Sequence, residues 1–446
     1  MKKHERWSNM NQPEIHNMGG IIRRVRKERG WRLEDVADEN ISPATISNIE
    51  RGVPHVNPNK TNYLLKKLGI GTDRLPELIM SEKRELQNLD FQFLMIEAQW
   101  EMGQWDQALT QLDQLDLDDQ HPYAAARHLW KGKCLSGKKS WKRAERSFYK
   151  AIQLCNPNGS SDSTNVEAFS FLELGLCSYY QNDLEKALQL TESGIDAFTP
   201  DGSRRYLWPL LHRNKGVYLE HLDRVAEGLK LVQEIWDSLD AIDDAETVLT
   251  FYWLRSELLC RTGMYEDAIR YAVDGVQIAR RNHRYHLMFS LFSVLGSAYM
   301  AQEEWEKAED SFDLALSCKE KMTGEKKRLI RTYDRLGILY MRQGKFEKAF
   351  SVIDQAIQYG ESSQDIPRLT HTLLLMGDCY RLQGNREEAI RYYERALGLA
   401  QEHGYKRKEN QALYALAQCW SGVDENEFQR CMGDGGSKWW LMSQIT

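Results

Sequence analysis

Gly296-Ser-Ala-Tyr299, followed by Ala308, Phe312 and Ala315, is the stretch that decides the fold. It places a large residue three positions after a small one, and a second small residue nine positions later. The pattern returns at steps of 40 to 43 residues, each copy opened by a small residue: Gly132, Gly175, Gly216, Ser256, Gly337, Gly377 and Ala417. Repeats of this length indicate a repeat architecture rather than the three or so globular domains that 446 residues would otherwise suggest.

Each copy of the pattern predicts a hairpin of two helices. Small residues on the first helix let the second helix approach closely, and Tyr or Phe fills the space beside them. Polar turns such as Gln343-Gly344-Lys345 join the two helices. The copies resemble the tetratricopeptide repeat, with a period longer than its usual length of about 34 residues. The resemblance implies an all-α, right-handed superhelix whose concave surface is lined by the first helix of each hairpin.

A second recognisable segment, from Met18 to Ile70, precedes the repeats. Ile21–Gly30 predicts one helix, and a short second helix follows it. A third helix is expected after Ser42, which suits the N-cap, with Pro43 at the first helical position and Gly52 as the stop. Three short helices with these caps predict a small helical head.

The string from Ser42 to Gly52 resembles the recognition helix of the xenobiotic-response-element (phage repressor and Cro) regulators, which bind DNA through a helix-turn-helix. The resemblance implies that bases are faced or flanked by Pro43, Ala44, Thr45, Ser47 and Asn48. An Asn side chain reads adenine through two hydrogen bonds, so Asn48 is the expected base reader. Glu50 is expected to be structural.

The charge of the chain is divided unevenly. The total of −6 is made of +4 in residues 1–80, with 14 Lys or Arg against 10 Asp or Glu, and −10 in the remainder, with 45 against 55. A basic head on an acidic array fits DNA binding by the head alone. The expected phosphate contacts are Arg23, Arg26, Arg32, Arg51 and Lys60.

A helix-turn-helix joined to repeats of about 40 residues resembles the RRNPP quorum-sensing regulators of Gram-positive bacteria and their phages. Members bind a short linear signalling peptide, imported into the cytoplasm, in the groove of the repeats. The peptide changes dimer geometry or oligomeric state and so the occupancy of DNA. The resemblance implies three partners: a double-stranded DNA operator, a short signalling peptide and a second copy of the chain in a homodimer.

Polar side chains on the first helices of the repeats are the candidates for binding the peptide. In the RRNPP family an Asn that clamps the peptide backbone often lies two positions before the repeat Gly, and Asn214 stands in this place before Gly216. The further candidates on the same faces are Arg213, Glu220, Trp253, Glu257, Asp334, Arg331, His371, Asp378 and Arg381. For each of these except Asn214, an ion pair between helices is the stronger expectation.

Other classes of protein are disfavoured. No stretch approaches the roughly 18 uninterrupted apolar residues of a membrane helix, and the eight cysteines form no CxxC pair. We therefore expect a soluble, cytoplasmic protein without metal or other cofactor. No phosphate loop, nucleophile elbow or zinc motif is present, so no enzyme is expected. An alternative remains open: a repeat scaffold that docks a protein partner, for example a response regulator whose phosphorylation it modulates, with Gln residues in 71–105 contributing.

The expected organisation has five segments. A flexible N-terminus spans 1–17, the DNA-binding head 18–70, a linker helix 71–90, and the peptide-binding repeats 91–430, with about eight hairpins and a capping helix. The C-terminal tail, 431–446, contains Trp439 and Trp440, whose role stays open between a cap, a dimer contact and a mobile end.

Overall fold

The structure is a computed structural model that describes residues 12–53, 56–71, 75–119, 121–155, 164–322 and 326–433. Within these ranges the regular structure is helical, apart from one bridge between Asp38 and Ile41. The predicted all-α fold, a helix-turn-helix followed by a right-handed repeat superhelix, is confirmed. The first eleven residues of the predicted flexible N-terminus, and the tail with Trp439 and Trp440, lie outside the described residues.

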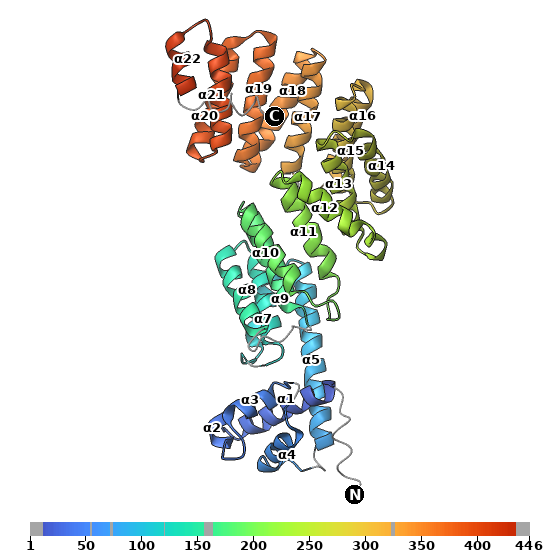
Figure 1. The fold of residues 1–446 in the computed structure, drawn as a ribbon, viewed down its shortest axis with the longest axis vertical. Coiled ribbons are helices and arrows are strands. Elements are labelled where there is room, and N and C mark those ends of the chain that lie inside the picture. Colours follow the sequence, from blue (N-terminus) through green and yellow to red (C-terminus); the bar gives the residue numbers. More distant parts are fainter. Residues whose placement is uncertain are drawn as a thin grey trace. The chain divides into compact units, whose positions relative to one another are not determined.

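The chain divides into two compact units, Met1–Leu211 and His212–Thr446, and each is described by itself. Unit 1 begins with the head, shown in blue in Figure 1. Its helices are α1 (Gln12–Glu28), α2 (Leu33–Val36), α3 (Pro43–Glu50) and α4 (Pro58–Lys67). α1 begins inside the stretch expected to be flexible.

The head folds around a small apolar core to which all four helices contribute. Its fully buried members include Ile22, Val36, Ile46 and Leu64. The closest crossing is between α1 and α3, where a Cβ on Gly19 would lie only 2.5 Å from the carbonyl oxygen of Ile49. α1 and α3 therefore touch backbone to backbone, which fixes the orientation of α3.

Unit 1 continues with the first hairpins of the array. The helices are α5 (Leu75–Glu101), α6 (Trp105–Gln114), α7 (Ala124–Gly137), α8 (Trp141–Cys155), α9 (Val166–Tyr180) and α10 (Leu184–Ala197). α5 is one helix of 27 residues, so it runs without a break through the predicted boundary between linker and repeats at residue 90. The division between the two units falls within α11 (Leu207–His221).

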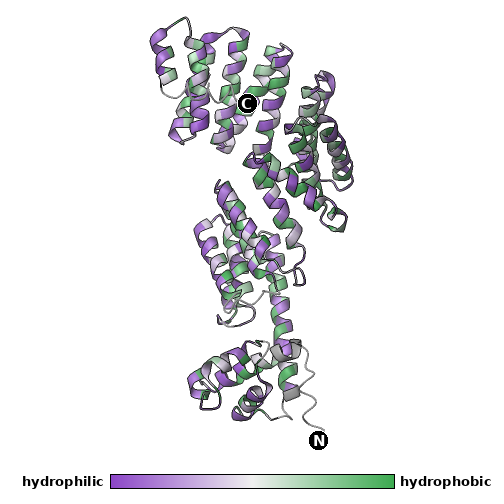
Figure 2. Cartoon of the chain, in the orientation of Figure 1, coloured by the Kyte–Doolittle hydropathy of each residue, from purple (hydrophilic) through white to green (hydrophobic). Residues whose placement is uncertain are grey.

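Unit 2 contains the remaining hairpins. After α11 come α12 (Val225–Trp236), α13 (Ala245–Arg261), α14 (Tyr265–Arg281), α15 (Tyr285–Ala301), α16 (Trp305–Ser317), α17 (Lys326–Arg342), α18 (Phe346–Ser363), α19 (Ile366–Gln383), α20 (Arg386–Glu402), α21 (Lys406–Trp420) and α22 (Glu425–Cys431). The repeat helices carry hydrophilic and hydrophobic residues together, as amphipathic helices do (Figure 2).

The small residues of the repeat lie where two helices cross. A Cβ on Gly132 would lie 2.5 Å from the ring of Phe148, and one on Gly377 would lie 2.4 Å from the ring of Tyr393. The large residue that fills the space beside the glycine therefore comes from the second helix, sixteen positions later. In the copy opened by Gly337 the side chain of Ile353 takes the same place, at 2.6 Å. The expected close approach is confirmed, and an aliphatic residue can replace the ring.

No helix in the part of the chain that the structure describes is long and apolar enough to span a bilayer.

Candidate functional site

The recognition helix α3 is held at its start by local hydrogen bonds. Ser42 caps it, because its Oγ accepts from the backbone N–H of Thr45 at 3.2 Å, and Pro43 follows at the first position. Ile46 and Ile49 are buried as expected, while Ala44 is exposed and Asn48 is half-buried. The outer face of the first turn is thus uncovered by the rest of the head.

Asn48, the expected base reader, has a partner within the protein. The guanidinium of Arg51 donates to Oδ1 of Asn48 at 2.7 Å and to the carbonyl of Ser47 at 3.2 Å. Both residues belong to the C-terminal end of α3, where Arg51 is the C-cap. Bidentate adenine reading needs Oδ1 as an acceptor. An operator contact would therefore have to exchange with Arg51.

Arg26 is not available as a phosphate contact, which corrects the prediction. Its guanidinium forms a two-pronged ion pair with the carboxylate of Glu50, at 2.6 and 2.7 Å, and also donates to the carbonyl of Trp31 at 2.7 Å. Arg26 and Glu50 are both 6% exposed. The hydrogen bonds to Glu50 raise the pKa of Arg26. The pair joins α1 to the end of α3, so Glu50 is structural, as expected.

Arg23, a second expected phosphate contact, is also occupied. It is buried and forms an ion pair with Asp118, in the segment that follows α6, and Lys27 pairs with the same carboxylate. Arg24 binds Glu85 of α5 at 2.7 Å. The basic side of α1 therefore docks the head on the first hairpin of the array instead of facing outward.

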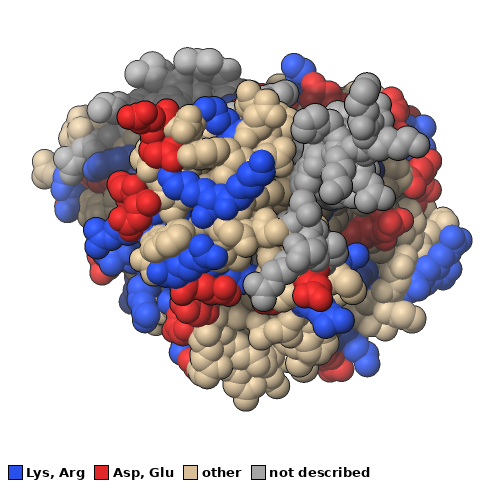
Figure 3. All heavy atoms as spheres, turned by 90° about the horizontal axis from the view of Figure 1, so that it is seen from below, with Lys and Arg blue, Asp and Glu red and all other residues tan. Residues whose placement is uncertain are grey.

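Arg32 and Lys60 remain on the surface of the head. Arg32 is exposed immediately before α2, and the ammonium of Lys60 donates to the carbonyl of Asn40 in the turn before α3. The same turn is fixed by Asp38, which accepts from the hydroxyl of Tyr63 at 2.6 Å and from Lys67. These two donors, Lys67 first, hold the pKa of Asp38 below its usual range. Figure 3 shows this end of the molecule, where Lys and Arg side chains gather with Asp and Glu among them.

The first helices of the hairpins in unit 2 (α11, α13, α15, α17 and α19) form what we call the inner face. Asn214, on α11, is only 5% exposed. Its Oδ1 accepts from Arg213 at 3.3 Å, while its Nδ2 is buried and has no hydrogen-bond partner. A buried amide donor without an acceptor is costly to a fold, and its presence in a native structure calls for an explanation.

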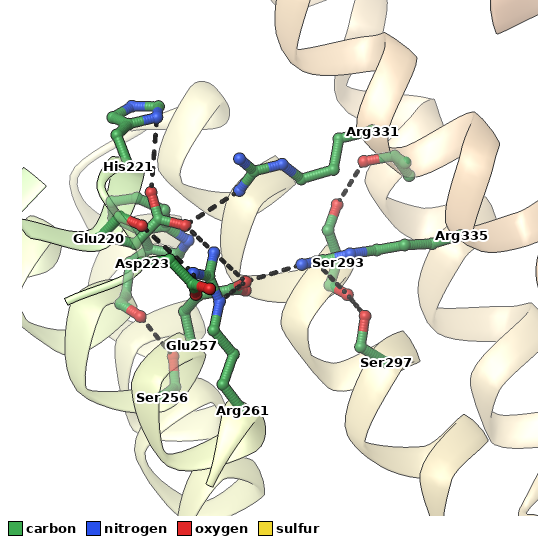
Figure 4. Close-up of polar contacts among 12 residues, drawn as sticks. Glu220, His221, Asp223, Ser256, Glu257, Arg261, Ser293, Ser297, Arg331 and Arg335 are labelled. Carbon is green, nitrogen blue, oxygen red and sulfur yellow. Dashed lines mark hydrogen bonds and ion pairs between the residues drawn. The ribbon is translucent and has the colours of Figure 1, made fainter. Parts of the chain in front are cut away.

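A network of five charged residues lies on the same face (Figure 4). Arg331 reaches Glu220 at 3.1 Å and Arg335 reaches Glu257 at 2.7 Å, both from α17. Arg261, at the end of α13, bonds both carboxylates: Glu257 at 3.2 Å and Glu220 at a shorter distance. The structure thus brings together three of the predicted residues, Glu220, Glu257 and Arg331.

The carboxylates of this network are buried and their guanidinium partners are less so. The side chains of Glu220 and Glu257 are 0% and 3% exposed, against 36% for Arg331. Burial alone would raise the pKa of Glu257, but Arg335, Arg261 and Arg331 outweigh it and hold the pKa below its usual range. Burial lowers the pKa of the neighbouring His221 to about 4, so this ring is neutral at pH 7.

Asp334 forms a separate site on α17. It is buried and accepts from the hydroxyl of Thr372 at 2.9 and 3.1 Å. Burial raises its pKa to about 7, against the effect of Thr372 and of nearby cations that include Lys408. Burial likewise lowers the pKa of Lys408 to about 8, against the opposing effect of Asp334. Asp334 therefore changes charge near neutral pH.

Of the remaining predicted residues, Asp378, Arg381 and Trp253 lie apart from the network, whereas His371 lies close enough to Arg331 for an electrostatic interaction. Asp378 accepts from the hydroxyl of Tyr393 at 2.7 Å, and Arg381 donates to the same hydroxyl at 3.3 Å, so both hold the second helix of their own hairpin. Trp253 is half-buried against the core of α13 to α15. His371 is exposed on α19.

Two residues of the network, Arg261 and Arg335, were not predicted from the sequence. Arg261 follows Glu257 by four positions and Arg335 follows Arg331 by four, which places each pair on one side of its helix. That spacing was the available signal. Among the described residues no cluster of His, Cys, Asp or Glu is arranged to hold a metal ion.

Comparison with known proteins supports both parts of the chain. The tetratricopeptide repeat family matches residues 287–362 and 328–402, and the helix-turn-helix family matches residues 22–73. Neither is a family of enzymes. The chain is 28% identical over 194 residues to outer dynein arm-docking complex subunit 4 of Xenopus laevis, covering 41% of this chain and 34% of that protein. The chain thus spans about a third of the length of this curated relative.

Solved structures of similar fold include regulators. The apo form of the quorum sensor NprR from B. thuringiensis has a TM-score of 0.57 and 15% identity, covering 77% of this chain and 96% of that one. A Rap protein complexed with competence and sporulation factor has a TM-score of 0.50 and 12% identity, covering 76% and 99%. At these identities the likeness shows the fold alone.

Proposed function

We propose that this chain, a helix-turn-helix domain joined to tetratricopeptide repeats, is a cytoplasmic transcriptional regulator without enzymatic activity. Its head binds a double-stranded DNA operator, and its repeats bind a short signalling peptide that changes the occupancy of that operator. The observation that carries the proposal is the outer side of α3, where the helix is capped by Ser42, Ala44 is exposed in the first turn and Asn48 is half-buried in the next.

The proposed DNA contacts are of two kinds, contacts to base edges and contacts to phosphates. Asn48 reads one adenine, Pro43 and Ala44 offer apolar contact to a thymine methyl, and Thr45 and Ser47 flank them. When Asn48 turns its amide to the base, Arg51 is released from Oδ1 and takes a neighbouring phosphate. Arg32 and Lys60 supply further phosphate contacts, so the affinity should fall steeply with salt.

Substitution of Asn48 tests the reading role. Asn48→Ala should cost about 1–3 kcal/mol at one operator base pair and leave binding to unrelated DNA unchanged. The measurement is fluorescence anisotropy with a genomic fragment selected by the full chain, in which each base pair is changed in turn. Asn282→Ala, an exposed Asn in the turn after α14, is the control. A loss spread evenly over all sequences would contradict base reading by Asn48.

The peptide role rests on the inner face of unit 2. The orphaned Nδ2 of Asn214 is a donor for a peptide carbonyl, and the charged network offers partners for side chains. Of the structures of similar fold, one is a quorum sensor and another is a complex with competence and sporulation factor. A tenfold change in operator occupancy requires the peptide to favour one arrangement of the protein by about 1.4 kcal/mol.

Thermal-shift screening with synthetic peptides tests this role. Peptides taken from the C-termini of small reading frames beside the gene should raise the melting temperature of the full chain, because a ligand stabilises the state to which it binds. Asn214→Ala should abolish the shift and leave DNA binding without peptide intact. Binding of a folded protein but of no peptide would favour the alternative role as a docking scaffold.

We propose that the homodimer forms through α5. Met80, Phe91, Met95 and Met102 are exposed and recur on one side of this helix with Arg84. An antiparallel pair of α5 helices crossing at Phe91 would set Met80 against the partner's Met102 and Arg84 near the partner's Glu101, so that apolar and opposite charged groups meet. Two heads on such a dimer would read two half-sites.

Light scattering tests this surface. Phe91→Glu should convert a dimer of the full chain into a monomer, because it buries a charge at the centre of the crossing. Met264→Glu, at an exposed Met of unit 2, is the control. An unchanged dimer would remove α5 from the interface, and a monomeric wild-type protein would exclude the homodimer.

A further inference from the structure

The network on the inner face of unit 2 holds three guanidinium groups around two buried carboxylates. Arg261, Arg331 and Arg335 surround Glu220 and Glu257, as Figure 4 shows. We infer that this cluster is a binding site for one carboxylate group of the ligand, and that Arg331 is the residue that receives it. The inference rests on the peptide-binding function proposed above and specifies the chemistry of the peptide.

Arg331 can move away from Glu220 without leaving that buried carboxylate unpaired. Arg261 already contacts Oε1 of Glu220 and Oε1 of Glu257, and its Nη1 donates to the backbone carbonyl of Glu220 at 3.2 Å. A buried carboxylate that loses its only cation is strongly destabilising. Because Arg261 stays in place, the two carboxylates remain paired when an arginine of α17 turns away.

Arg331 and Arg335 reach carboxylates on helices that are far from α17 in the sequence. Glu220 and Arg331 are 111 positions apart, on α11 and α17, and Glu257 and Arg335 are 78 apart, on α13 and α17. The helix between α13 and α17 is α15, which offers only small hydroxyl residues here. Ser293 accepts from Arg335 through its carbonyl at 3.4 Å, and Ser297 lies one turn further on (Figure 4). The arginines therefore extend over α15 and lie where a chain bound along the inner face would run.

The accessible edge of the network is formed by the guanidinium of Arg331. Arg331 is the most exposed member of the network, at 36%, against 27% for Arg261 and 19% for Arg335. The other groups near this edge are His221, which is neutral, Asp334, whose carboxylate is buried on Thr372, and Asp223, which is exposed at the rim and already paired with Arg261 at 3.2 Å. From α19 and α21, Arg368 and Lys408 add positive charge near Asp334. An anion that approaches on the side of Arg331 meets a guanidinium whose own carboxylate partner, Glu220, is buried behind it.

The ligand chemistry follows from the fork of donors on an arginine. A guanidinium binds a carboxylate through two parallel hydrogen bonds, a geometry that amides and neutral groups do not match. The peptide therefore carries a carboxylate at this point, either as an Asp or Glu side chain or as its free C-terminus. Its binding replaces the contact of Arg331 with Glu220, which is one link between α17 and α11.

The test is affinity selection with the full chain and four libraries of synthetic heptapeptides, read by mass spectrometry. The libraries combine a free or amidated C-terminus with the presence or absence of Asp and Glu. Enrichment of free acids alone assigns the C-terminus, and enrichment of acidic members in amidated form assigns a side chain. Equal enrichment of peptides with and without a carboxylate would overturn the inference and leave peptide binding standing. No enrichment in any library would overturn both.

Two variants of opposite sign locate the site. Arg331→Gln should weaken binding of the selected peptide at least tenfold, and Arg331→Lys should restore part of it. Glu220→Gln should strengthen binding, because Arg331 then lacks its competing carboxylate. Arg342→Gln, at an exposed position of the same helix α17, is the matched control. Carboxylate-dependent binding that neither Arg331→Gln nor Glu220→Gln changes would place the carboxylate elsewhere.

Discussion

Lys133 of unit 1 and Glu257 of unit 2 occupy the same place in their repeats, one position after the small residue that opens the copy. Both are buried charges, at 6% and 2% exposed. Their surroundings differ. The ammonium of Lys133 lies 4.0 Å from the ring centre of Trp100, 4.3 Å from that of Phe169 and 4.6 Å from that of Trp130, and 3.2 Å from one carboxylate oxygen of Glu173.

The surroundings of Lys133 and of Glu257 offset the free-energy cost of a buried charge in different ways. Around Lys133, aromatic faces and a single carboxylate complete the neutralisation and exclude water. Around Glu257, three partly exposed arginines pair with two buried carboxylates and, at the rim, with Asp223, so the guanidinium groups rather than the buried carboxylates are accessible. The same repeat position therefore holds an enclosed ion pair in unit 1 and belongs to a partly exposed charged network in unit 2.

The largest loss of stability is expected when Lys133 is replaced. Lys133→Met should fill the aromatic cage but leave Glu173 buried without a cation, at a cost of about 3–5 kcal/mol in the free energy of unfolding. Urea unfolding followed by circular dichroism measures it. The double variant Lys133→Met with Glu173→Gln should recover most of the loss. If the double variant is no more stable than the single one, the rings rather than the ion pair hold this site.

A smaller effect is expected for the counterpart in unit 2. Glu257→Gln should cost about 1–3 kcal/mol, because Arg335 loses its carboxylate but is partly hydrated and Arg261 keeps Glu220. Since the pKa of Glu257 is depressed to about 2, its contribution is fully present above the ordinary Glu pKa and is lost progressively as the pH falls from there through the folded value. The cost of the substitution should therefore shrink below about pH 4. A cost as large as that of Lys133→Met, or one independent of pH, would remove the contrast.

The smallest effect on stability is expected at Asp334, where removal of the charge should stabilise the protein instead of destabilising it. Burial raises the pKa of Asp334 to about 7, so the folded state binds the proton more tightly than the unfolded chain does. Stability should therefore fall as the pH rises from about 4 to 7. Asp334→Asn should stabilise the protein by about 1–2 kcal/mol at pH 8 and have little effect at pH 4, measured by urea midpoints at both values. An equal effect at both pH values would show that the carboxyl does not titrate in this window.

The repeat was predictable because its requirement is local. Every hairpin needs a small residue where its helices cross, so Gly132, Gly296 and Gly377 mark the crossings in the sequence itself. The filling side chain sixteen positions later was less evident, since Phe, Tyr and Ile all serve. The boundary at residue 90 was not readable, because α5 keeps a helical pattern through it.

The errors and omissions at the candidate sites come from partners far along the chain. Arg26 was expected at the surface, but Glu50, 24 positions later, lies against it. Likewise Arg331 and Glu220 were each named from their places on helix faces, whereas their meeting across 111 positions depends on how successive hairpins turn. The spacing of four residues within α13 and within α17 would have added Arg261 and Arg335 to the candidates. The contact between these two helices, however, could be known only from the fold.

The contact between Gly19 and the backbone of Ile49 has a practical consequence for engineering. The tilt of α3 is set from behind, by main-chain atoms and by the Arg26–Glu50 pair, and not by the side chains that face outward. If the proposed base contacts are correct, exchanging positions 43, 44, 45, 47 and 48 together should change the operator that the head binds and leave the tilt of α3 unchanged. Position 19 has to stay glycine in such a redesign, because a Cβ there would collide with the backbone of α3.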